Sequence, residues 1–291
     1  MLWLIYALFA AAAFGISTIA DKIAVTKFFK SPWSYYGWWV AYSIALAPLF
    51  LIFAQGPVSI NGYAIIAGMI SALSSAVYLS AMGKEDATRV ISLVFVGPIF
   101  VAIFSTAFLG DVLAPQDYIG IIVLVLGTTM MGIKEPRKMT LTRGAQLALV
   151  VAFLYSLSTL TYKAATGVSD PFVAIFWEWL AYGVFGAVIA HGYLGKFREE
   201  FPKLGIPRIG FLLAVAAVVG VAYTALTYAY MLQSAALVSA VSSAQPLFVV
   251  FYALFATAAV PKLMKEELGR KTMAFKVLGG LLIILGVYLV S

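Results

Sequence analysis

The feature that most constrains this chain is a series of long apolar runs that recurs from one end to the other. Several runs reach eighteen or more residues, the length a helix needs to cross the roughly 30 Å hydrocarbon core of a bilayer. Hydrophobic residues make up 63% of the chain and charged residues 11%, whereas soluble domains are about half apolar and a quarter charged. Strand-like alternation is missing, so helices must satisfy the buried amides. The sequence therefore predicts an all-α membrane protein.

Turn signals divide the apolar runs into ten predicted transmembrane helices. The first five are expected at Leu2–Ala20, Trp33–Phe53, Ile60–Met82, Thr88–Leu109 and Gln116–Ile133. The second five are expected at Gly144–Ala165, Pro171–His191, Ile206–Leu232, Ala235–Ala258 and Met273–Val290. A polar connector, 134–143, joins the two units 1–133 and 144–291. The first apolar run has no basic start and no cleavage site, so it is interpreted as a span rather than a signal peptide.

A stretch in the first unit, 90–132, occurs again in the second. Shifts of 148 and 159 positions bring its conserved-looking proline and glycines into register, pairing Pro98 with Pro246, Gly120 with Gly279 and Gly127 with Gly286. Chance similarity between apolar runs would not keep these residue types aligned. About eleven extra residues near 261–271 account for the change of shift. Because each unit holds an odd number of helices, we expect an inverted-topology repeat of two five-helix halves around a central cavity.

The basic residues indicate an orientation. All but one of the 19 lysines and arginines fall in the odd-numbered connections, and Lys163 is the exception. Since basic loops remain cytoplasmic, both termini are expected outside, in a multi-pass protein of the plasma membrane. Placement in short loops also explains the formal charge of +7 without nucleic-acid binding.

Motifs within the duplicated stretch resemble a known family. The run Gly97-Pro98-Ile99-Phe100, then Phe108-Leu109-Gly110-Asp111 and Gln116 to Gly120, is similar to the drug/metabolite transporter superfamily in its EamA-like branch. The run Ala244-Gln245-Pro246-Leu247-Phe248 is similar to it too. This resemblance implies a ten-helix secondary transporter of amino acids or other small metabolites, often an exporter, with relatives that carry nucleotide sugars, sugar phosphates or choline.

The chain departs from that family pattern in two respects. Asp111 stands where the family usually has Glu, and the equivalent acid of the second copy is displaced, leaving Glu266 or Glu267 in its place. Family members are also generally described with both termini in the cytoplasm, opposite to the orientation that the loop charges predict.

Glu178 is the clearest candidate for a functional residue. It lies about eight residues into the seventh helix, roughly 12 Å from the helix start, near the middle of the bilayer. A carboxylate there costs several kcal/mol unless it faces a cavity or a partner, and burial favours its neutral form, which suits a proton carrier. The alternative is a protonated or paired Glu that locks helices together.

Other polar and aromatic residues are weaker candidates for the same site. Trp177 and Trp179 flank Glu178, and with Trp38, Tyr78 and Tyr228 they are expected to wall a cavity or to belong to interfacial belts and packing. Lys163 is expected either to bind an anionic substrate group or to snorkel to the interface. Asp21 is interpreted as an interfacial charge.

Two prolines mark predicted hinges. Pro98 and Pro246 each remove a backbone donor and free the carbonyl four residues back, so both helices are expected to be kinked or broken at equivalent positions. Gln245, directly before Pro246, is a candidate substrate ligand. Ser71, Ser74 and Ser75 could add hydroxyl partners, although such serines often only bond the preceding turn.

The sequence also excludes several functions. It has no GxxxxGK[ST] run for ATP, no cysteine and a single histidine, His191, so we expect no enzyme, no cofactor and no metal site. The leading interpretation is a proton-coupled secondary transporter of small polar metabolites, acting by alternating access as a monomer or homodimer. Two alternatives stay open: an uptake carrier for a small organic cation such as a choline-like amine, and a non-transporting membrane structural or receptor protein.

Overall fold

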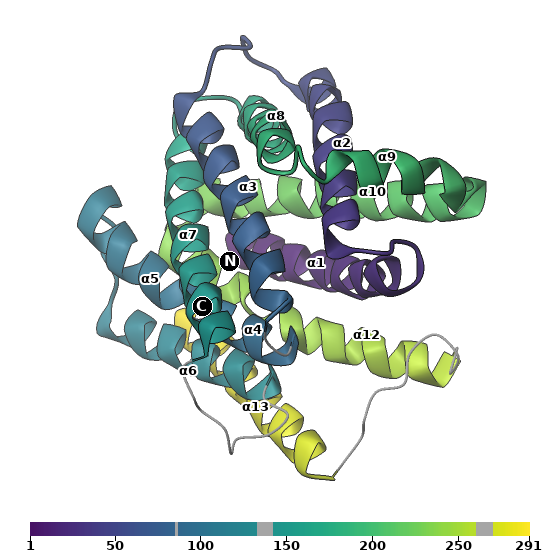
Figure 1. Ribbon diagram of the computed structural model, residues 1–291. Helices are drawn as coiled ribbons and strands as arrows, with labels where there is room; N and C mark the ends of the chain where they lie inside the picture. Colours follow the sequence, from purple (N-terminus) through teal and green to yellow (C-terminus); the bar gives the residue numbers. More distant parts are fainter. Residues whose placement is uncertain (85–86, 133–141, 260–269) are drawn as a thin grey trace.

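The computed structural model describes residues 1–84, 87–132, 142–259 and 270–291, and every regular element in these ranges is helical (Figure 1). The elements are α1 (Leu2–Lys27), α2 (Pro32–Phe50), η1 (Leu51–Phe53), α3 (Gly62–Met82), α4 (Ala87–Val94), α5 (Gly97–Phe104), η2 (Ser105–Leu109), α6 (Pro115–Gly132), α7 (Arg143–Thr166), α8 (Pro171–Ile189), α9 (Leu194–Glu200), η3 (Phe201–Leu204), α10 (Ile206–Leu232), α11 (Ala235–Ser242), α12 (Gln245–Ala259) and α13 (Arg270–Val290). The connector 134–143 is described only at its last two residues, and Glu266 and Glu267 lie outside the described residues.

Within the described residues, eight helices are long and apolar enough to cross a membrane. They are Leu2–Lys27, Pro32–Phe53, Gly62–Met82, Arg143–Thr166, Pro171–Ile189, Ile206–Leu232, Ala235–Phe255 and Met273–Val290. Two shorter apolar helices, Gly97–Leu109 and Pro115–Met131, lie at the remaining predicted spans. The chain is thus an all-helical, multi-pass membrane protein.

Polar caps fix where several spans begin. The Ser31 side chain accepts a hydrogen bond from the Ser34 amide at 3.1 Å, and the Asp170 carboxylate accepts one from the Phe172 amide at 2.9 Å. A proline follows each cap at the first helical position, where its missing N–H costs nothing. Asn61 caps α3 and also donates to Ala165 O at 3.0 Å, tying the start of α3 to the end of α7.

The first helix is longer than the sequence predicts. It continues past the expected end at Ala20 to Lys27, because no glycine or proline interrupts the chain between 16 and 31. The extra two turns keep Asp21 on the same helix as Phe14 and Ser17. Because α1 continues in this way, Asp21 belongs to the part of the helix that lines the cavity.

The fourth and ninth predicted spans are each broken near the middle. α4 ends at Val94 and α5 begins at Gly97, while α11 ends at Ser242 and α12 begins at Gln245. These bounds coincide under the 148-residue shift that relates the two copies. The predicted interruption of both helices at equivalent positions is therefore confirmed.

The backbone at the two breaks follows the same pattern. At each break the backbone makes hydrogen bonds between residues three apart, as in a 3-10 turn, in place of the α-helical bonds between residues four apart. Val96 N–H donates to Leu93 O at 3.2 Å, and Ala244 N–H donates to Val241 O at 3.0 Å. Pro98 and Pro246 then lie in the first turn of the following segments. Proline is tolerated there, whereas inside a continuous helix it would clash with the preceding turn.

A short helix that the sequence did not predict lies between α8 and α10. α9 and η3 pack against the start of α2 (Figure 1): the Phe201 ring stacks on Trp38 at 5.5 Å, and an added Cβ at Gly37 would lie 2.7 Å from the Phe197 ring. The segment carries both charges and large aromatic residues, so it covers apolar surface on one face only.

The two halves repeat one packing pattern. α1 packs along α10 and α12, and α7 packs along α3 and α5, so the first helix of each half contacts the third and fourth spans of the other (Figure 1). α6 and α13, the last spans of the halves, pack along each other, as do α2 and α8.

Four glycines bring α6 and α13 into backbone contact. An added Cβ at Gly127 would lie 2.7 Å from Gly279 O, and one at Gly286 would lie 3.0 Å from Gly120 O. Small residues of this kind are how membrane helices gain packing contact. The earlier glycine of α6, Gly120, pairs with the later glycine of α13, Gly286, and Gly127 pairs with Gly279, so α6 and α13 run antiparallel. We call these four residues the glycine seam.

The glycine seam predicts a stability effect for Gly127→Ala. The added methyl group must push α13 away, which we expect to cost about 1–3 kcal/mol, as overpacking of a tight interface does. The measurement is the thermal unfolding midpoint of the purified protein in detergent. Gly210→Ala on α10 is the control, because an added Cβ there meets nothing within 4 Å. Equal midpoints for the two variants would contradict the tight seam.

Candidate functional site

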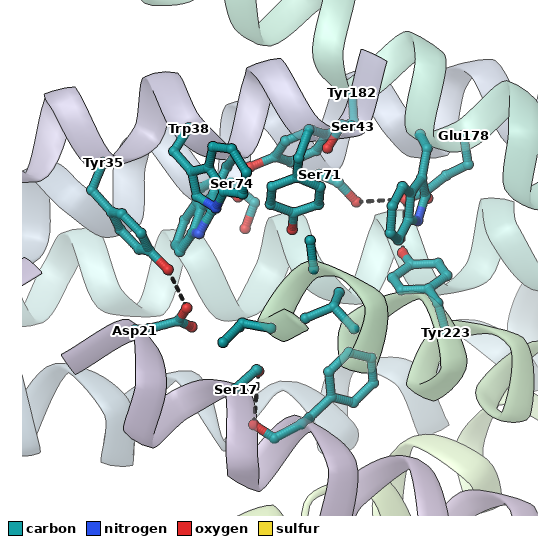
Figure 2. A pocket seen from close by; sticks show the side chains of 18 of the residues that line it. Ser17, Asp21, Tyr35, Trp38, Ser43, Ser71, Ser74, Glu178, Tyr182 and Tyr223 are labelled. Carbon is teal, nitrogen blue, oxygen red and sulfur yellow. Dashed lines mark hydrogen bonds between the residues drawn. The ribbon is translucent and has the colours of Figure 1, made fainter. Parts of the chain in front are cut away.

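A cavity of about 270 Å³ lies among α1, α2, α3, α7, α8 and α10. Its walls combine aromatic rings, serine hydroxyls and two carboxylic acids (Figure 2). The lining residues are Phe14, Ser17, Asp21, Tyr35, Trp38, Trp39, Tyr42, Ser43, Ser71, Ser74, Ser75, Tyr155, Glu178, Trp179, Tyr182, Val215, Ala216, Val219 and Tyr223. None of these is basic. The cavity therefore offers an acidic, aromatic environment at the level of the membrane-spanning helices.

Glu178 lies in the cavity wall with a defined set of partners. Only 2% of the residue is exposed, and its Oε1 accepts hydrogen bonds from the Tyr223 hydroxyl at 2.8 Å and the Ser71 hydroxyl at 3.3 Å. Ser71 is also hydrogen-bonded to Ser158 at 2.7 Å, and Ser158 donates to Ala67 O at 3.1 Å. One network thus joins α8, α10, α3 and α7. Buried carboxyl groups need such partners, since an unpaired one costs several kcal/mol.

The position of Glu178 depends on a glycine of α3. An added Cβ at Gly68 would lie 2.2 Å from Glu178 O and 2.9 Å from the Tyr182 amide nitrogen. The backbones of α3 and α8 are therefore in direct contact at Glu178 itself, the residue that carries the carboxylate. This contact brings Ser71, one turn further along α3, within hydrogen-bonding distance of Glu178.

Asp21 is the second acid of the cavity. The Tyr35 hydroxyl donates a hydrogen bond to its Oδ1. The sequence predicts an interfacial charge at Asp21, and the structure adds that α1 continues past Ala20 and places Asp21 in the cavity wall. Figure 2 shows Asp21 and Glu178 on opposite sides of the cavity, with serine and aromatic side chains between them.

Aromatic rings in edge-to-face contact form the wall between the two acids. The Tyr42 and Trp179 centroids lie 5.6 Å apart, and those of Trp179 and Tyr223 lie 5.8 Å apart. Trp38 lies 5.5 Å from Tyr42 on the preceding turn of α2. Such contacts hold the rings rigid, and rings beside a desolvated space attract cations through their faces.

Six of the residues that the sequence singled out as site candidates line this cavity, namely Trp38, Ser71, Ser74, Ser75, Glu178 and Trp179. Trp177 points away from it, because its indole N–H donates to Ser59 O at 2.8 Å in the connection before α3. The Lys163 ammonium donates to Tyr230 O and, at 2.9 Å, to Gln233 O, so it satisfies carbonyls at the end of α10.

The remaining sequence candidates make structural contacts outside the cavity. Gln245 donates from Nε2 to Thr18 Oγ1 at 2.8 Å and to Phe14 O at 3.3 Å, which ties the start of α12 to α1. Tyr228 stacks on Tyr6 with centroids 5.7 Å apart, and Tyr78 packs with a small cluster of apolar residues at the end of α3. The predicted hinges Pro98 and Pro246 also lie outside the lining.

Sequence reasoning overlooked Asp21, Tyr35 and Tyr182 as wall residues. A signal for Asp21 was present, because an acid within an uninterrupted apolar helix is expected to face a cavity or a partner. For the two tyrosines the sequence gave no signal that separates a cavity wall from an interfacial belt.

Comparison with known proteins assigns the first half of the chain. Residues 1–133 match the sequence model of the EamA-like transporter family. The resemblance seen in the sequence is thereby confirmed for the first half of the chain, and this family is part of the drug/metabolite transporter superfamily. The apolar helices and the EamA-like match together point to a multi-pass membrane protein whose first half is similar to a transporter family.

Structural comparison agrees at the level of the fold. One solved structure, described only as "Crystal structure of protein", superposes with a TM-score of 0.73 at 16% sequence identity, covering 100% of this chain and 94% of the other. The whole chain, including its second half, therefore adopts a fold already seen in a solved structure. No curated protein matches the sequence.

No metal centre accompanies the cavity within the described ranges. Among these residues, no three side chains of His, Asp or Glu come together as ligands. The chemistry available at the site is thus proton binding, hydrogen bonding and attraction of positive charge.

The hydrogen bonds to Glu178 predict the effect of Tyr223→Phe. This variant keeps the ring and its aromatic neighbours but removes one donor to a buried carboxyl group, which costs about 1–3 kcal/mol. We expect a lower thermal unfolding midpoint in detergent. Tyr288→Phe is the control, because Tyr288 is 74% exposed. A Tyr223→Phe midpoint equal to that of the control would show that the hydroxyl does not stabilise Glu178.

Proposed function

We propose that this EamA-like protein is a proton-coupled secondary transporter that moves a small, positively charged amine through the cavity at Glu178. The observation that carries the proposal is a buried carboxylate in a cavity with aromatic walls and no basic lining residue. A carboxylate at membrane depth binds either a proton or a cation, and exclusive binding of the two couples their movements.

The charge of the cavity favours the organic-cation interpretation over amino acids. An amino acid brings a carboxylate that needs a positive partner, and the lining residues include no Lys, Arg or His. Lys163, the candidate for that role, is held by the carbonyls of Tyr230 and Gln233. The serine hydroxyls of α3 can bind a substrate carboxylate, but more weakly than a basic side chain would. Amino acids are therefore tested alongside amines.

The arrangement of the helices supports two inverted five-helix halves, each contributing five of ten spans. The glycine seam pairs Gly120 with Gly286 and Gly127 with Gly279, which are equivalent contacts with the two copies exchanged. A twofold relation produces this reciprocal pairing. Because the seam helices are equivalent and antiparallel, the axis that relates the halves lies in the plane of the membrane.

One asymmetry between the halves supports alternating access. α3 and α8 meet backbone to backbone at Gly68, whereas the equivalent pair, α10 and α2, faces the cavity with residues such as Ala216 and Tyr42. We propose that the two pairs exchange these roles during transport, one closing as the other opens. The broken helices at Pro98 and Pro246 provide the flexible points, and a single chain encloses the cavity, so a monomer suffices.

The basic connections suggest which side the cavity faces. Asp21 and Tyr35 lie near the end of α1 and the start of α2, where Lys22 and Lys27 of α1 and Lys30 of the connection are found. If basic loops are cytoplasmic, both termini lie outside in the plasma membrane, and the cavity extends toward the cytoplasm.

The proposal predicts amine-dependent proton movement that requires Glu178. Purified protein in liposomes with an internal pH-sensitive dye is challenged first with pooled monoamines and then with pooled amino acids. We expect the monoamine pool to move protons, and Glu178→Gln to reduce the signal to that of empty liposomes. Glu199→Gln on α9 is the control, since this acid is exposed and remote from the cavity.

Two results would contradict the proposal. Unchanged proton movement in Glu178→Gln would remove Glu178 from coupling, and the absence of any signal with either pool would argue against a proton-coupled carrier. A response to amino acids alone would replace the amine by the amino-acid class.

A further inference from the structure

We infer that the cavity is built for an organic dication, a short linear diamine whose two ammonium groups bind Glu178 and Asp21. This inference rests on the proposed function and specifies its substrate. The two acids come from different helices, α8 and α1, and lie on opposite sides of the cavity (Figure 2). They are the only ionisable acids among the lining residues, and no base accompanies them.

Both carboxylates keep one oxygen available. The hydrogen bonds to Glu178 from Tyr223 and Ser71 both end on Oε1, and the bond from Tyr35 to Asp21 ends on Oδ1. Within the described residues, no donor reaches Glu178 Oε2 or Asp21 Oδ2, and neither atom is sealed from the cavity. Each acid is therefore oriented by a tyrosine while its second oxygen remains free for an ammonium donor.

Two carboxylates in one cavity create a requirement for two positive charges. Asp21, Tyr42 and Glu178 line the same cavity, so the acids influence the same small space. In a medium of low effective dielectric constant, an uncompensated charge costs several kcal/mol. A monoamine neutralises one acid and leaves the other to bind a proton, whereas a diamine neutralises both.

The space between the acids suits a methylene chain. It is walled by the rings of Trp38, Tyr42 and Trp179, which offer apolar faces along their contact with the cavity. A volume of about 270 Å³ lies just below the range typical of drug-sized ligands, so it fits a molecule of a few heavy atoms. Hydroxyls of Ser43 and Ser74 on the same walls add acceptors for ammonium hydrogens.

A divalent metal ion does not satisfy the same geometry. Metal ligands must converge on one point within about 2–2.6 Å, whereas Asp21 and Glu178 face each other across the cavity. Acids on opposite sides of the cavity suit a ligand whose two charges are joined by a spacer.

The test compares diamines with monoamines of equal chain length. Binding and liposome uptake of 1,4-diaminobutane and 1,5-diaminopentane are measured against butylamine and pentylamine on the purified full chain. We expect the diamines to bind on the order of tenfold or more tighter, because a second charge-assisted hydrogen bond adds about 1.5–3 kcal/mol. Asp21→Asn is expected to lower diamine affinity to the monoamine level.

Controls separate this inference from the proposed function. Asp21→Glu restores the charge and should recover the diamine preference, and Glu199→Gln should match the unmodified protein. Equal affinities for diamines and monoamines, or an unchanged diamine preference in Asp21→Asn, would overturn the inference while leaving amine transport intact. Loss of all amine binding from the unmodified protein would instead overturn the proposed function. A thermal unfolding midpoint of Asp21→Asn in detergent close to that of the unmodified protein shows that the variant is folded.

Discussion

The backbone contact between Gly68 and Glu178 is the constraint on which the site depends. A side chain at position 68 would overlap the carbonyl oxygen of Glu178, so glycine is what lets α3 and α8 approach this closely. The contact places the hydroxyl of Ser71 at the carboxylate and closes one boundary of the cavity. Burial of an acid at membrane depth is tolerable only because the surrounding helices supply donors from several directions. Gly68 therefore determines both how closely α3 and α8 pack and which hydroxyl reaches the carboxylate of Glu178.

Symmetry and its local loss have different roles in this fold. The broken helices and the glycine seam repeat in both halves, down to the positions at which the backbone changes its hydrogen bonding. The acids do not repeat: Glu178 corresponds to Gly37 in the alignment that pairs Lys163 with Lys22. The two halves therefore share one helical framework. Each half contributes one acid to the cavity, Asp21 or Glu178, at a position where the other half has no acid.

The sequence predicted the framework better than the site. Apolar runs and turn signals located the spans because the bilayer imposes length and polarity on each helix independently. Pro98 and Pro246 revealed the breaks because proline acts on its own backbone. Asp21 was assigned to the interface because its location depends on where α1 ends. Trp177 and Gln245 were equally good candidates by type, but helix rotation, which follows from packing with neighbours, turns them toward Ser59 and Thr18. Rules that act on each helix separately predict where the helices lie in the sequence. Which residues line a cavity depends on how several helices pack together.

The glycine seam has a mechanical consequence. Neither α6 nor α13 contributes a residue to the cavity lining, so the tightest contact between the halves lies away from the substrate space. Backbones that pack this closely at four glycines have no side chains between them to hold the crossing angle of the two helices. Any rocking of the halves would then use the seam as a fulcrum, and displacement would increase with distance from it. A small change of angle at Gly127 and Gly279 becomes a larger change of width where Asp21 and Glu178 face each other.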